Sequence, residues 1–138
     1  MKICNELSYL YEKVLEAYNN AYAPYSNFQV GAAVELDNGE IIIGANVENA
    51  SYGLCNCAER SALFAVYSKG YRKENIVRMM IIANTKNPVS PCGACRQVIS
   101  ELVDSEVDVV LTNLNKDVKV LKVKDLLPYA FTEGDLNE

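Results

Sequence analysis

A chain of 138 residues, 50% of them hydrophobic and 22% charged, is predicted to form one globular domain over residues 1–138. Its net charge of −5 argues against nucleic acid as a partner, because the phosphates would repel the chain. The sequence contains no apolar run of about 20 residues, the length needed to span a membrane, so a membrane is not expected as a partner. The complete absence of histidine excludes Ser-His-Asp and Cys-His catalysis and every metal site with a histidine ligand.

The N-terminal segment carries charges too early and too often for a secretory signal peptide. We therefore expect a cytoplasmic protein whose five cysteines are metal ligands or thiols rather than disulfides. Apolar residues at helical spacing predict an amphipathic helix over residues 2–22, which ends before Pro24. Cys4 is expected to be half-buried in that helix.

Two strands are predicted next, over 28–36 and 41–47, with turn residues at 37–39 that make them a β-hairpin. The elements that follow are a helix over 57–68, a strand over 77–83, a helix over 91–103, strands over 107–112 and 118–123, and a helical turn over 125–130. The nearly continuous apolar run at 77–83 is typical of a strand covered on both faces, whereas 118–123 is expected to be a short edge strand. This order predicts an α/β layered domain with a mixed sheet.

Cysteines mark the start of both central helices. Ser90 and Pro91 are suited to the N-cap and first helical positions, which would place Cys92 and Cys95 on one face of the first turns. Free backbone N–H groups and the positive end of a helix lower the pKa of such thiols. Two thiolates so placed make half a zinc site.

Cys57 opens the other helix, and three thiolate ligands result if the two helix starts converge. A fourth position left for water would make the site catalytic rather than structural. Glu59 would then be near the metal without being a ligand, where a proton shuttle is needed. Zinc with three thiolates carries a net charge of −1, so positive groups should compensate: the helix N-termini and Arg60, with Arg96 as a further candidate.

The same residues also have plainer explanations. Asn56 and Glu59 fit a capping box, with a side chain at the N-cap and an acid three residues on. A Cys-x-x-Cys pair occurs in redox motifs as well as in structural zinc sites. Together with Cys57, Cys92 and Cys95, Cys55 would complete a closed zinc site of four cysteines. The protein would then be a non-catalytic binding module that zinc stabilises.

Cys-Ala-Glu, followed about 35 residues later by Pro-Cys-x-x-Cys, is the three-cysteine signature of zinc deaminases. Over nearly its whole length the chain resembles the small homotetrameric cytidine deaminases. The resemblance is carried by AYAPYSNFQVGAA (21–33), NVENASY (46–52), CAER (57–60), SPCGACRQ (90–97) and LLPYAF (126–131). It implies a three-layer α-β-α fold with a mixed five-stranded sheet.

The resemblance also implies the chemistry of the site. Cys57, Cys92 and Cys95 would bind one zinc ion per subunit, and Arg60 would donate hydrogen bonds to the ligand sulfurs. Glu59 would be the general acid/base that takes the proton of the attacking water, passes it to N3 of the pyrimidine and protonates the leaving amine. The products of cytidine and deoxycytidine would be uridine, deoxyuridine and ammonia.

Substrate-binding residues follow from the same resemblance. Asn46 and Glu48 would hold the ribose 3′-hydroxyl, since side chains two apart on an extended segment point the same way; taken alone, they are two polar residues ending a strand. Phe28, otherwise a hairpin core residue, would pack against the base, beside Ala58. Three further residues would help to close a neighbouring subunit's pocket in a homotetramer: Ala50, Tyr52 and Phe131.

The enzyme alternative is a deaminase of a cytosine-containing antibiotic such as blasticidin S. The family resemblance implies that such proteins lack the Asn-x-Glu pair, so Asn46 and Glu48 argue against it. A nucleotide or polynucleotide substrate is disfavoured because NVENASYG contains no basic residue.

Overall fold

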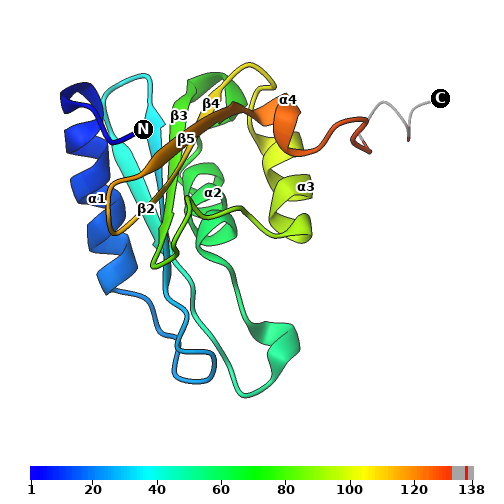
Figure 1. Cartoon of the computed structure of the whole chain (residues 1–138). Helices are drawn as coiled ribbons and strands as arrows, with labels where there is room; N and C mark the ends of the chain where they lie inside the picture. The colour runs from blue at the N-terminus through cyan, green and yellow to red at the C-terminus, as the bar shows by residue number, and fades with distance from the viewer. Residues whose placement is uncertain (132–135, 137–138) are drawn as a thin grey trace.

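The computed structural model describes residues 1–131 and residue 136. Five strands form one sheet in the order β2-β1-β3-β4-β5 (Figure 1). Their bounds are β1 Val30–Leu36, β2 Ile41–Ala45, β3 Ile76–Ala83, β4 Asp108–Asn113 and β5 Val118–Lys122. The β3–β4 pair is parallel and the other three pairs are antiparallel, so the predicted mixed five-stranded sheet with β5 at an edge is confirmed.

Helices cover both faces of this sheet. Their bounds are α1 Ser8–Asn19, α2 Ala58–Ser68, α3 Gly93–Leu102 and the short α4 Val123–Leu126, with 3-10 turns at Asn5–Leu7, Tyr52–Leu54 and Lys73–Asn75. Helix α1 lies on one face, and α2 and α3 lie side by side on the other (Figure 1). The three-layer α-β-α arrangement is therefore confirmed. No helix among residues 1–131 is both long enough and apolar enough to cross a membrane.

The central strand β3 divides its side chains between two apolar clusters. Met79 and Ile81 pack in the cluster beneath α2 and α3, whereas Met80 and Ile82 pack in the cluster beneath α1. This alternation follows from the two-residue period of a strand. Burial of each such side chain contributes about 1.5–3 kcal/mol, so both helical layers are anchored to β3.

Two glycines let the helices approach the sheet closely. A Cβ atom on Gly44 of β2 would lie 2.4 Å from the backbone nitrogen of Ala62 and 2.7 Å from the carbonyl oxygen of Ala58, both in α2. A Cβ atom on Gly31 of β1 would lie 2.5 Å from the backbone nitrogen of Tyr18 in α1. Only glycine fits at such separations, so Gly44 determines how α2 sits on the sheet.

The predicted helix over 2–22 is too long at both ends, because sheet-like contacts compete with it. The backbone N–H of Ile3 donates to the carbonyl of Lys116, and that of Tyr22 donates to the carbonyl of Asn46. Cys4 lies before the helix and is exposed, so its expected half-burial is wrong. The helical turn expected over 125–130 lies earlier, at α4, and residues 127–130 are not helical. The turn starts at Val123 because the Asp125 carboxylate accepts from the backbone N–H of Lys122 at 3.2 Å.

Candidate functional site

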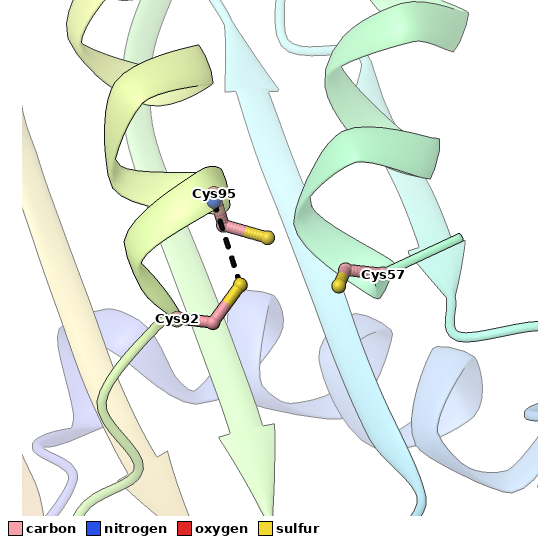
Figure 2. A group of neighbouring side chains, drawn as sticks. All are labelled: Cys57, Cys92 and Cys95. Carbon is pink, nitrogen blue, oxygen red and sulfur yellow. Dashed lines mark hydrogen bonds between the residues drawn. The ribbon is translucent and has the colours of Figure 1, made fainter. Parts of the chain in front are cut away.

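The starts of α2 and α3 bring three cysteines together (Figure 2). Cys57 is the N-cap residue of α2, Cys92 is the N-cap residue of α3, and Cys95 lies in the first turn of α3. Their sulfur atoms all lie within 4.8 Å of one another and point toward a common centre. Sulfurs about 2.3 Å from a tetrahedral zinc ion are roughly 3.8 Å apart, so the spacing suits that metal.

The Cys92 thiol itself caps α3. Its sulfur accepts a hydrogen bond from the backbone N–H of Cys95 at 3.5 Å, and the helix begins at Gly93. The predicted N-cap role of Ser90 and first-turn position of Pro91 are therefore wrong. A ligand sulfur at the cap is held by backbone N–H groups and by the positive end of the helix.

Their surroundings shift the pKa values of Cys92 and Cys95 in opposite directions. Burial opposes ionisation of Cys92, but hydrogen bonds from the backbone N–H and thiol of Cys95 outweigh it and lower the Cys92 pKa. Burial, the Glu59 carboxylate and the sulfurs of Cys92 and Cys57 all raise the pKa of Cys95. Three thiolates this close need a divalent ion to ionise together, and soft thiolate ligands suit zinc.

Arg60 supplies positive charge to this cluster. Its Nη2 donates to the sulfur of Cys57 at 3.3 Å, and this hydrogen bond is the main reason why the Arg60 pKa is raised. Its Nε is buried without a hydrogen-bond partner among the described residues. The positive charge of this half-buried guanidinium is favourable next to thiolates.

Arg96 does not take part in charge compensation as expected. Its guanidinium donates to the carbonyl oxygens of Pro91 at 2.9 Å and Leu126 at 2.6 Å and to the hydroxyl of Ser90. Arg96 therefore ties the loop before Cys92 to the end of α4.

Glu59 is a buried carboxyl group beside the cysteines. It lies in the first turn of α2 with 4% of its surface exposed, and burial is the main reason why its pKa is raised. The capping-box explanation is wrong: Cys57 is the N-cap, and within the described residues its side chain makes no capping hydrogen bond. Asn56 instead donates to the hydroxyl of Ser61 at 3.0 Å.

Cys55 lies outside the cluster. Its sulfur accepts from the backbone N–H of Asn49 at 3.2 Å and also contacts the carbonyl oxygen of Asn49 at 3.5 Å. In the part of the chain that the structure describes, the metal-binding group consists of the other three cysteines alone. The closed four-cysteine site is therefore contradicted.

A cavity of about 260 Å³ opens beside the cysteines. Its lining residues are Ser26, Phe28, Val30, Asn46, Glu48, Cys57, Ala58, Glu59, Val89, Ser90 and Cys92. Seven of these are residues that the sequence predicted to belong to the site, and they come from segments far apart in the chain. Ligand pockets usually span about 300–1,000 Å³, so this one suits a small molecule rather than a polymer.

The polar wall of the cavity is held by the segment before β1. Asn46 accepts from the backbone N–H of Val30 at 2.9 Å and donates to the carbonyl of Phe28 at 2.8 Å. The Glu48 carboxylate accepts from the Ser26 hydroxyl and from the backbone N–H groups of Tyr25 and Ser26. These bonds, chiefly from Ser26, lower the pKa of Glu48, so Glu48 is an ionised hydrogen-bond acceptor. Strand β1 starts at Val30 rather than at 28 because Phe28 bonds to Asn46 and Ser26 instead of to the sheet.

Ala50, Tyr52 and Phe131 are the residues that the resemblance assigns to a neighbouring subunit's pocket. None of the three is among the described residues that line this cavity. Tyr52 is 81% exposed and Phe131 57% exposed, and Ala50 is also exposed. The carbonyl of Phe131 accepts from the Gln97 side chain at 3.0 Å, which holds the segment after α4 against α3.

Sequence reasoning missed Ser26, Val30, Val89 and Ser90 as lining residues, and expected Ser90 only as a helix cap. Ser26 and Val30 lie in the 21–33 segment that carried the resemblance, and Val89 directly precedes the cysteine motif. Their positions within or next to these segments are the signal that could have identified them.

Comparison with known proteins agrees with this geometry. Residues 4–111 match the cytidine and deoxycytidylate deaminase zinc-binding region, a span that contains all three cysteines. The cytidine deaminase of Halalkalibacterium halodurans is 52% identical over 129 residues, which cover 94% of this chain and 96% of the relative. A cytidine deaminase of Mycobacterium tuberculosis is 39% identical over 88% of this chain and 86% of its own. The crystal structure of cytidine deaminase from Burkholderia pseudomallei has a TM-score of 0.87 at 50% identity, covering 94% of this chain and all of the other.

Proposed function

We propose, because the chain belongs to the cytidine and deoxycytidylate deaminase zinc-binding family, that it hydrolyses cytidine and deoxycytidine to uridine, deoxyuridine and ammonia. The observation that carries this proposal is the meeting of three thiols and one buried carboxyl group at a single small cavity. Cys57, Cys92 and Cys95 form the zinc-binding cluster. A site with three protein ligands keeps a coordination position for water, as catalytic zinc sites do.

Glu59 is the residue that moves protons in this reaction. When bound, zinc supplies Lewis acidity and lowers the pKa of water, which provides a nucleophile at neutral pH. The Glu59 carboxylate takes one proton of the attacking water and delivers it to N3 as the C4–O bond forms. It then transfers the second water proton to the amino group as the C4–N bond breaks. Burial supports this role, since it raises the pKa of Glu59 and so makes its carboxylate a stronger base for the water proton.

The remaining lining residues would bind the nucleoside. The partly exposed ring of Phe28 and the small side chain of Ala58 would contact the base, and Asn46 and Glu48 would hold the ribose 3′-hydroxyl. All four line the cavity. The ionised Glu48 supports the ribose assignment, because a hydroxyl donor is bound more tightly by a charged acceptor than by a neutral one.

The ultraviolet absorbance of cytidine incubated with the zinc-loaded protein tests this function. A steady conversion to the spectrum of uridine, with ammonia released in equal amount, is the expected result. If neither cytidine nor deoxycytidine changes while blasticidin S is deaminated, the nucleoside assignment is wrong. If none of the three changes, the proposal of a hydrolytic deaminase fails.

We further propose that the protein acts as a homotetramer in the cytoplasm, with Ala50, Tyr52 and Phe131 closing a neighbouring subunit's pocket. The exposure of Tyr52 and Phe131 supports this, because large apolar side chains on a surface are typical of interfaces. The five free cysteines support a reducing compartment. Light scattering should give a mass of four chains of 15.3 kDa each; a single-chain mass would refute the shared pocket.

A further inference from the structure

The loop between α1 and β1 contains a serine that contacts two walls of the cavity at once. The Ser26 hydroxyl donates to Oε2 of Glu48 and accepts from the backbone N–H of Phe28 at 3.1 Å. The turn around it is tight: the N–H of Asn27 donates to the carbonyl of Ala23, and Asn27 has a φ of 58°. Ser26 itself lines the cavity.

The Glu48 carboxylate has few acceptor positions left after these contacts. A carboxylate offers about four lone-pair sites, two on each oxygen. Oε1 accepts from the backbone N–H groups of Tyr25 at 3.0 Å and Ser26 at 3.1 Å, which uses both of its sites. Oε2 accepts from the Ser26 hydroxyl and so retains one. A ligand in the cavity that Glu48 lines can therefore give it one strong hydrogen bond.

Ser26 controls where that remaining acceptor lies. Without its hydroxyl, the two backbone donors would still hold Oε1, but Oε2 would be free to rotate about the carboxylate axis. The N–H of Phe28 would also lose its acceptor, although Asn46 would still bond to the Phe28 carbonyl. Loss of the Ser26 hydroxyl should therefore change the orientation of the Glu48 carboxylate more than the position of Phe28.

We propose that Ser26 is a positioning residue for sugar recognition: it orients the Glu48 carboxylate so that its last acceptor site meets a single sugar hydroxyl of the nucleoside. This inference rests on the proposed function, in which Glu48 binds the 3′-hydroxyl. Ser26 acts through Glu48, and its effect should appear only with substrates that carry that hydroxyl.

Steady-state kinetics of Ser26→Ala with cytidine and 3′-deoxycytidine test this proposal. Loss of an ordered hydrogen bond to a charged group corresponds to about a tenfold change in binding. We expect KM for cytidine to rise about tenfold with kcat changed less than twofold, and KM for 3′-deoxycytidine to stay the same within twofold. Ser26→Thr, which keeps a hydroxyl, should restore KM for cytidine to within threefold of the wild-type value.

Ser8→Ala is the matched control, since the Ser8 hydroxyl also bonds at an exposed position, to the carbonyl of Cys4, and should change neither KM. An equal rise of KM for both substrates in Ser26→Ala would overturn the proposal, as would an unchanged KM for cytidine. If the wild-type protein does not distinguish the two substrates, the assignment of Glu48 to the 3′-hydroxyl fails first, and this inference with it. If the wild type and Ser26→Ala distinguish them equally, the inference alone fails.

Discussion

Replacing Gly44 with alanine should damage catalysis and zinc binding out of proportion to its effect on stability. The added Cβ would lie 2.4 Å from the Ala62 nitrogen, and ordinary contact begins near 3.4 Å, so α2 must move about 1 Å away from the sheet. Overpacking of this kind costs about 1–3 kcal/mol, which corresponds to a Tm decrease of roughly 4–12 °C for a chain of this size. Cys57 and Glu59 lie at the start of α2 and would move with it. A 1 Å displacement of catalytic groups lowers kcat by about 100-fold.

Gly31→Ala is the matched control, because it makes the same kind of contact with α1, which contributes no residue to the cavity. Thermal unfolding followed by circular dichroism, cytidine kinetics and zinc release to a chromogenic chelator should be measured on both variants. We expect similar losses of Tm, but the large loss of kcat and faster zinc release only in Gly44→Ala. Equal kcat in the two variants would refute the argument that the seating of α2 on β2 positions the site.

Three further predictions follow from individual contacts. Cys55→Ser should keep zinc and activity, whereas Cys57→Ser should lose both; metal loss in Cys55→Ser would contradict the three-cysteine cluster. Arg60→Gln should release zinc about 10- to 100-fold faster, as is typical when a group that supports a metal ligand is removed, and an unchanged release rate would exclude its role at Cys57. The hydrogen bond with Lys2 is the main cause of the lowered pKa of Asp117. The ionised carboxylate therefore stabilises the fold at pH values above its ordinary pKa of 3.8. This stabilisation is lost as the pH falls through the lowered pKa. Asp117→Asn should accordingly lower Tm at pH 7, and the difference in Tm from the wild type should shrink steadily as the pH is lowered below 3.8; a constant difference in Tm would show that the effect is not ionic.

The elements with a local cause were predictable from the sequence. The strands from 30 to 45 and from 76 to 83 follow from apolar periodicity and from the turn at 37–39, and their limits in the structure differ from the predicted ones by one or two residues. From the residues alone, a three-cysteine site could be predicted only on the condition that the two helix starts lie close together in the fold. The resemblance to a family supplied that condition, and the sheet order satisfies it by placing α2 and α3 side by side.

The errors arose where a specific contact in the folded chain outweighs the preference read from residue type alone. Pro91 is well suited to a first helical position, yet Cys92 caps α3 because its sulfur bonds to the N–H of Cys95. Arg96 looked like a cation for the metal site, but carbonyl groups near α4 attract its guanidinium. The direction of Cys55, toward Asn49, likewise depends on the folding of its loop. The spacing of residue types along the sequence does not identify such hydrogen-bond partners.

The role of Glu59 is decided by the zinc content and cytidine turnover of Glu59→Gln, determined on the same sample. Glutamine keeps the shape of the side chain but cannot carry the proton, and Glu59 is not a member of the cysteine cluster. We expect one zinc ion per chain, an unfolding temperature at least equal to that of the wild type, and turnover reduced by at least about 100-fold. Turnover close to the wild-type rate with zinc bound would contradict the central claim that the buried Glu59 carboxyl group transfers the protons.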